Sequence, residues 1–214
     1  MLSFFAAKGG VGCSVVAASA ALLASSAAPT LLVDLNGDLP ALLGVDTDDR
    51  PGLAEWLAAE MPLPDALRRI EVPITDRLSL LTAGEGRMRP SAPQSRILAR
   101  LLSAEGRTVI LDVGTQSQVV VPLLAASRRT ILVTRACYLA LRAARRGPDP
   151  DAVVLVAEPG RALRPQDVGA SVGVAVGPVI RWDPAIARAV DAGLLSARLP
   201  RALRPLEQLL GLGS

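Results

Sequence analysis

The residues best suited to chemistry form a glycine-rich segment near the start of the chain. The segment reads Lys8-Gly9-Gly10-Val11-Gly12-Cys13-Ser14. Its glycines allow several backbone N–H groups to turn toward one point, and a helix expected directly afterwards adds the positive end of its dipole. Together these features predict an anion site for the β-phosphate of a nucleotide. The hydroxyl of Ser14 lies where a Mg²⁺ ligand belongs.

One position in this segment lacks the usual phosphate-binding cation. A lysine that contacts the β- and γ-phosphates is normal just before the Ser or Thr, but here the residue is Cys13. A neutral thiol cannot replace that charge-assisted hydrogen bond, worth roughly 1.5–3 kcal/mol, so nucleotide affinity should fall by about one to two decades. Cys13 is interpreted either as a small residue tolerated in a decayed site or as a reactive thiolate at a helix N-terminus.

Two aspartates follow apolar runs that are typical of buried strands. Asp34 ends the first run and Asp112 the second, so both should lie at the edge of the sheet beside the phosphate loop. Beyond Asp34 comes Asn36, whose amide can hold a water molecule but cannot accept a proton. Asp38 follows two residues later. It is interpreted either as a partial substitute for a catalytic acid or as a helix N-cap.

The elements that must position these residues alternate between short apolar runs and helical patterns, which is typical of βαβ units. The expected fold is α/β, a three-layer α-β-α P-loop NTPase fold with a mostly parallel central sheet. Residues 1–214 are expected to form a single domain, with 199–214 as a C-terminal tail helix. The expected strands are 2–6, 30–35, 78–82, 108–113, 130–134, 152–157 and 174–180. The expected helices are 14–25, 39–44, 52–60, 64–70, 92–103, 119–126, 138–146 and 184–192.

The composition excludes several classes of function. The chain has no histidine, which excludes Ser-His-Asp hydrolysis and His-ligated metals, and its two cysteines cannot form a metal cage. No apolar run reaches the roughly 18 residues of a membrane span. Residues 1–5 lead straight into the glycine-rich segment and so do not resemble a signal peptide. The expected location is the cytoplasm, with peripheral contact at the inner face of the membrane as a variant.

Three motifs together resemble the ParA/MinD family of P-loop ATPases. The loop beginning at Lys8 is similar to the family's deviant Walker A motif, the segment 31–38 to its switch I, and Val109-Ile110-Leu111-Asp112-Val113-Gly114 to its Walker B. The resemblance implies ATP or ADP with Mg²⁺ as cofactors, and it implies that Asp34 and Asp112 help Ser14 to hold the Mg²⁺. It also implies a homodimer in which Lys8 reaches the partner's nucleotide. It also implies that Asp183 and Pro184 lie near the adenine. Asn36 replaces the aspartate that orients the attacking water in the family.

These departures leave two hypotheses. The first is a degenerate, TadZ/CpaE-like scaffold for positioning or assembly, related to pilus, secretion or cell-division systems, with weak or absent ATP hydrolysis. The alternative is an active, ATP-dependent dimerising switch. A protein partner is expected but not identified. For Arg142, Arg145 and Arg146, a solvated helix end is favoured over contact with DNA. For the tail, packing on the domain is favoured over contact with a membrane.

Overall fold

The computed structural model describes all residues except 48–49, 61, 86–90, 116–120 and 213–214. Its described strands form one eight-stranded sheet in the order β3-β4-β2-β5-β1-β6-β7-β8. Every neighbouring pair is parallel except β3 and β4. The strands are β1 (Leu2–Ala6), β2 (Thr30–Asp34), β3 (Val72–Thr75), β4 (Leu78–Leu81), β5 (Thr108–Thr115), β6 (Arg129–Arg135), β7 (Ala152–Ala157) and β8 (Val176–Arg181). The predicted mostly parallel α/β fold is confirmed.

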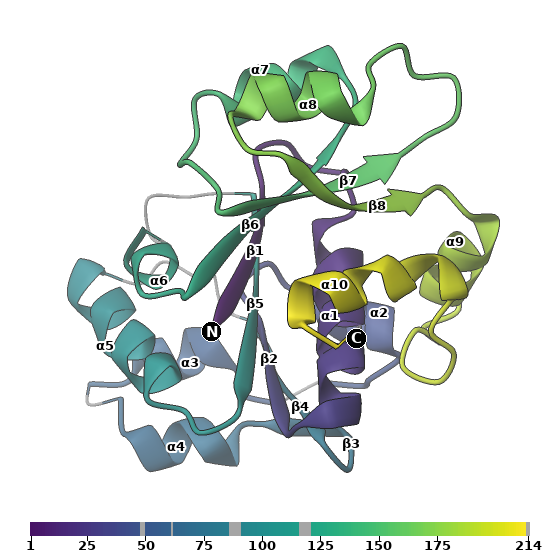
Figure 1. Ribbon diagram of the computed structural model, residues 1–214. Helices are drawn as coiled ribbons and strands as arrows, with labels where there is room; N and C mark the ends of the chain where they lie inside the picture. Colours follow the sequence, from purple (N-terminus) through teal and green to yellow (C-terminus); the bar gives the residue numbers. More distant parts are fainter. Residues whose placement is uncertain (48–49, 61, 86–90, 116–120, 213–214) are drawn as a thin grey trace.

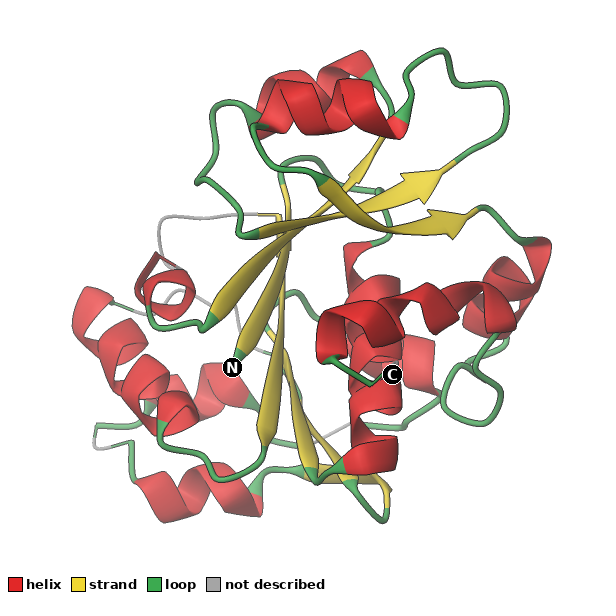
Figure 2. Cartoon of the chain, in the orientation of Figure 1, coloured by secondary structure: helices red, strands yellow, loops and turns green. Residues whose placement is uncertain are grey.

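Helices cover both faces of this sheet and make three layers (Figures 1 and 2). On one face lie α1 (Cys13–Ala27), α2 (Leu39–Leu43), α9 (Pro184–Asp191) and the C-terminal tail. On the other lie α3 (Leu53–Ala58), α4 (Pro64–Arg69), α5 (Ala92–Ser103), α6 (Val121–Ala125), α7 (Tyr138–Ala144) and α8 (Pro165–Val172). Phe4 and Phe5, both buried, point into opposite layers because successive strand side chains alternate. Covered faces explain why the central strands β2, β5, β6 and β7 each contain an uninterrupted run of apolar residues.

The helix after the glycine-rich loop is rich in small residues, and this lets it lie close to the sheet. Most of α1 is buried, and alanine favours the helix as well as the close packing. The hydroxyls of Ser19 and Ser25, which are also buried, bond back to the carbonyls of Val15 and Leu22 at 2.6 and 2.9 Å. The helix therefore buries its polar side chains without leaving them unpaired.

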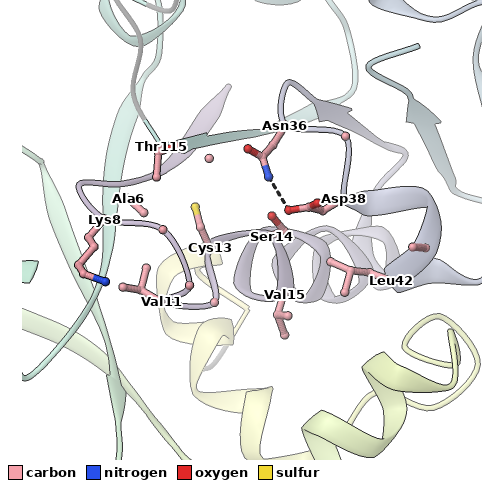
Figure 3. Close-up of a pocket in the computed structure, with 16 residues that line it drawn as sticks. Ala6, Lys8, Val11, Cys13, Ser14, Val15, Asn36, Asp38, Leu42 and Thr115 are labelled. Carbon is pink, nitrogen blue, oxygen red and sulfur yellow. Dashed lines mark hydrogen bonds between the residues drawn. The ribbon is translucent and has the colours of Figure 1, made fainter. Parts of the chain in front are cut away.

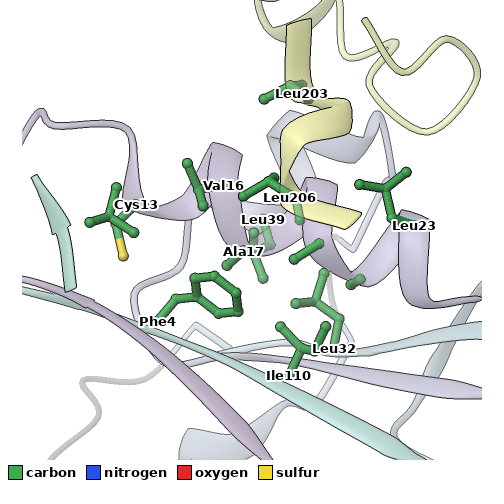
Figure 4. Packing of buried hydrophobic residues seen from close by; sticks show 14 of the residues in the cluster. Phe4, Cys13, Val16, Ala17, Leu23, Leu32, Leu39, Ile110, Leu203 and Leu206 are labelled. Carbon is green, nitrogen blue, oxygen red and sulfur yellow. The ribbon is translucent and has the colours of Figure 1, made fainter. Parts of the chain in front are cut away.

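The C-terminal tail differs from the single helix that was expected. It forms a 3₁₀-helix, Arg201–Leu206, followed by the short helix α10, Glu207–Leu210. Pro205 has no N–H group to donate, so a regular α-helix cannot run through it. Leu203 and Leu206 are fully buried and pack on α1, as Figure 4 shows. The tail thus lies against the domain, and its central leucines are not available to a membrane.

Two elements were not expected from the sequence. Strand β3 is a four-residue antiparallel edge strand that contains Pro73, so it lacks the long apolar run that indicates a buried strand. No element was expected where helix α8 lies, although Pro165 in its first turn and Asp167, which accepts from the backbone N–H of Arg164, are helix-start signals. The helix expected from residue 119 is described from Val121 onward.

Among the described residues, no helix has the length and hydrophobicity needed to cross a bilayer.

Candidate functional site

A cavity of about 490 Å³ lies at the carboxyl ends of β1, β2 and β5, where ligands bind in open α/β sheets. Figure 3 shows the loop after β1 and the loop after β2 facing each other across it. The cavity brings together most of the residues singled out in the sequence: Lys8, Gly9, Gly10, Val11, Gly12, Cys13, Ser14, Asn36 and Asp38. Thr115, Ala41 and Leu42 also line it and were not anticipated. Of these, Thr115 could have been inferred, because it directly follows the motif that ends at Gly114.

The loop backbone has the geometry of a phosphate cradle. Gly10 and Gly12 have φ angles of 75° and 94°, in the left-handed region that favours glycine. Gly12 is the N-cap of α1 and provides no side chain to cap it, so the first N–H groups of the helix remain available at the cavity. Fifteen residues of helix add their dipole at this point. An anion placed here would meet N–H donors and positive potential together.

The side chain of Cys13 lies beneath the loop and does not extend across the cavity. It is 7% exposed, and its sulfur lies on the side of the loop that faces the sheet (Figure 3). Burial, followed by the charge of Asp112 and a hydrogen bond to it, raises the pKa of the Cys13 thiol well above its usual range. The thiol is therefore neutral and shielded, and the interpretation of Cys13 as a reactive thiolate is wrong.

Asp34 and Asp112 form a buried acidic pair under the loop. They are register partners on the adjacent strands β2 and β5, and neither is exposed. Asp34 accepts three backbone N–H bonds, from Asn36, Gly37 and Leu39, at 2.7–3.0 Å. Burial raises its pKa, and these bonds partly offset the rise.

Asp112 is less well satisfied than Asp34. Its Oδ1 atom accepts from the N–H of Gly114 at 3.1 Å, whereas its Oδ2 atom is buried and has no hydrogen-bond partner in the described part of the chain. Burial, with the nearby charge of Asp34, raises the pKa of Asp112 to about 6, although the Ser14 hydroxyl acts in the opposite direction. An orphaned carboxylate oxygen close to Ser14 is what a Mg²⁺ site would leave when no cation is bound. The residues Ser14, Asp34 and Asp112 therefore fit this ion.

The loop after β2 is held by its own side chains. Asn36 Nδ2 donates to Asp38 Oδ2 at 2.5 Å, and Asn36 Oδ1 lies so close to Gly114 that a Cβ atom there would come within 2.5 Å of it. Asp38 precedes α2 but makes no capping bond with its side chain. Asp38 thus occupies the N-cap position of α2, as one of its two interpretations held, but the carboxylate that bonds to the first N–H of α2, that of Leu39, belongs to Asp34.

Asp183 and Pro184 lie apart from the residues that line the cavity. Asp183 is the N-cap of α9 and accepts from the N–H of Ala185 at 2.8 Å. Beside it, Trp182 is 54% exposed and borders a hollow of about 360 Å³ at the ends of β7 and β8. There Glu158 pairs with both Arg135 and Arg161. Arg135 was not singled out in the sequence, because nothing local distinguishes it from the other arginines.

No protein-family model and no curated protein matches the chain. Solved structures do match it over nearly its whole length. A ParA family ATPase from Chlorobium tepidum is 21% identical, with a TM-score of 0.79 over 99% of this chain and 98% of that one. MinD in a MinC:MinD cell division complex from Aquifex aeolicus is 16% identical, with a TM-score of 0.79 over 100% and 96%. MinD with Mg-ADP from Pyrococcus horikoshii is 19% identical, with a TM-score of 0.74 over 97% and 94%. The chain therefore has the fold of the ParA and MinD ATPases.

Proposed function

We propose that this chain is a degenerate ParA/MinD-like protein that acts as a positioning or assembly scaffold and hydrolyses ATP weakly or not at all. The observation that carries the proposal is the position of Cys13. Where a phosphate-binding lysine would extend into the cavity, a neutral thiol lies buried beside Asp112. Lys8 is the one cation among the residues that line the cavity, all of which the structure describes. A P-loop with half of its usual positive charge can hold a nucleotide but stabilises the transition state poorly.

Nucleotide binding remains part of this proposal. The cradle formed by Gly10, Gly12 and the start of α1 supports binding of the phosphates, and Ser14 with the acidic pair supports Mg²⁺. Bound Mg²⁺ would neutralise phosphate charge and fix the phosphate orientation. The Mg-ADP in the Pyrococcus horikoshii MinD structure supports ATP or ADP as the ligand class. Asp183 and Pro184 stay proposed neighbours of the base.

Loss of hydrolysis has a second, independent support in the loop after β2. Asn36 cannot accept a proton, and its amide is bonded to Asp38. The Oδ2 atom of Asp38, the nearest acid to position 36 in the cavity, is therefore engaged by this amide. An active site that has lost both the cation at position 13 and the acid at position 36 is consistent with a structural role.

A scaffold of this kind needs partners. The MinC:MinD complex supports a protein partner, and Lys8, exposed and without an ion pair in the described residues, supports a homodimer closed over nucleotide. The role that we propose for such an assembly is TadZ/CpaE-like.

Calorimetry with Mg²⁺ and ATP, together with a phosphate-release assay, tests the proposal. We expect measurable binding and no release above buffer in the wild type. Cys13→Lys should bind ATP about 10- to 100-fold more tightly, because it restores a charge-assisted bond. It should still not turn over unless Asn36→Asp is added. Cys13→Ser, which stays neutral, is the matched control and should bind as the wild type does.

Two results would overturn the scaffold function. One is wild-type phosphate release that Lys8→Ala abolishes, because this would establish the active switch. The other is unchanged ATP affinity in Cys13→Lys when the variant is folded, because the missing charge would then not be what limits binding.

A further inference from the structure

Helices α7 and α8 lie side by side on the face of the sheet opposite α1 (Figure 1), and a second concave surface lies between them. This groove has a volume of about 550 Å³ and shares no lining residue with the phosphate-loop cavity. Tyr138, Arg142, Arg145 and Arg146 border it from α7 and the turn that follows, and Asp167 and Ser171 border it from α8. None of these residues is explained by nucleotide binding.

The groove carries a concentrated positive charge. Arg142 lies four residues after Tyr138, and Arg145 and Arg146 lie three and four residues after Arg142, which places these side chains along one side of α7 and its final turn. The three arginines are exposed, and none has an ion-pair partner within the described part of the chain. The acid facing them, Asp167, already accepts from the backbone N–H of Arg164 at 2.8 Å. The positive charge of the groove is therefore available to a ligand.

Apolar surface accompanies this charge. Tyr138 is 70% exposed and Leu139 is 59% exposed, although both are large hydrophobic side chains. Leu141 is buried and forms part of the groove wall, and Leu163 lines the groove from the segment before α8. Exposed apolar groups beside unpaired arginines are typical of a surface that a partner covers, because burial of the apolar groups and pairing of the arginines both favour binding.

We infer that this groove binds an acidic, amphipathic segment of a partner protein, whose carboxylates pair with the three arginines and whose apolar side chains contact Tyr138 and Leu139. A peptide fits better than DNA, because a phosphate backbone offers no apolar groups to a hollow with leucine walls. Non-specific DNA binding also draws on many phosphate contacts, whereas the net charge of the chain is only +3. This inference rests on the proposed scaffold function, because it names the kind of partner that the scaffold would bind. Its test requires no nucleotide.

Selection from a random peptide library displayed on phage, using the full chain as bait, tests the inference. Enriched peptides should combine several Asp or Glu residues with at least one large apolar residue. A fluorescein-labelled peptide made from that selection should bind the wild type more weakly as salt is raised above about 0.15 M, where charges on the surface are screened beyond about 8 Å. The groove variant Arg142→Glu/Arg145→Glu/Arg146→Glu should bind it at least about tenfold more weakly.

A variant with the same change of charge elsewhere is the matched control. Arg188, Arg198 and Arg201 are exposed and lie on α9 and the segment after it, on the other face of the sheet. Replacing all three with Glu should leave peptide affinity within about twofold of the wild type, because these charges lie on the opposite face of the sheet from the groove. Circular dichroism establishes that both variants are folded, and the single variant Arg145→Glu serves if the triple variant is not.

Three outcomes would overturn the inference. The first is a selection that yields no peptide above background, or only peptides without acidic residues. The second is equal loss of affinity in the groove and control variants, which would show a general charge effect. The third is a short DNA duplex that binds the wild type, fails to bind the groove variant and still binds the control, because the groove would then be a nucleic-acid site. None of these results depends on ATP binding or hydrolysis.

Discussion

Replacing Asp112 with asparagine should stabilise the protein at neutral and alkaline pH. The carboxylate of Asp112 is buried, its Oδ2 atom has no partner in the described residues, and the carboxylate of Asp34 lies on the neighbouring strand. An amide of the same shape keeps the bond from Gly114 to Oδ1 and removes the buried charge. The expected gain comes from the native state, in which ionised Asp112 is unfavourable.

The size of the gain follows from the pKa of Asp112, which is about 6 in the folded chain against an ordinary value of 3.8. Each pH unit between these values corresponds to about 1.4 kcal/mol, so the full difference is about 3 kcal/mol. Between the two values the native state holds more protons than the unfolded state, so wild-type stability falls as pH rises from 3.8 to 6. The advantage of Asp112→Asn should be about 3 kcal/mol at pH 8, about half of that at pH 5, and small near pH 4.

Urea unfolding of both proteins across this pH range, without nucleotide or divalent cations, measures the difference. Asp151→Asn is a matched control, for which the expected change in stability has the opposite sign. Bonds from the backbone N–H and the hydroxyl of Thr130 hold the pKa of Asp151 below its usual range, so this loss of charge should lower stability at pH 8 and have no effect in acid. If Asp112→Asn lowers stability, or shifts it equally at pH 5 and pH 8, Asp112 is a satisfied carboxylate and the reasoning fails.

Two further predictions concern the tail and the thiols. Leu206→Ala should lower the free energy of unfolding by about 2–5 kcal/mol, because Leu206 is fully buried against α1, whereas Leu212→Ala, at a residue 37% exposed, should change it by no more than about 0.5 kcal/mol. Urea unfolding measures both, and a loss for Leu206→Ala as small as the one expected for Leu212→Ala would mean that the tail does not stabilise the domain. In a Cys137→Ser variant, Cys13 should not react with a thiol reagent until the chain is unfolded, when one equivalent should react. Stoichiometric labelling of the native variant would contradict the buried, neutral thiol.

Much of the fold was predictable because its signals are local. Uninterrupted apolar runs indicated strands covered on both faces, and a glycine-rich turn between a strand and a helix indicated the phosphate loop. The same kinds of local signal did not predict the correct element where a proline interrupted the pattern. The edge strand β3 contains Pro73, and the tail contains Pro205, which turned an expected α-helix into a 3₁₀ segment. Helix α8 was missed although Pro165 marked its start.

The amino-acid sequence by itself determined which groups are present at the site: a cradle of glycines, one lysine, Ser14, two strand-end aspartates, and neither a lysine at position 13 nor an aspartate at position 36. The tertiary structure decided what those groups do. Pairing of β2 with β5 brought Asp34 and Asp112 into register, burial raised their pKa values, and packing turned the thiol of Cys13 toward Asp112. These properties depend on contacts between residues almost eighty or a hundred positions apart, and so no local pattern of residue types could contain them.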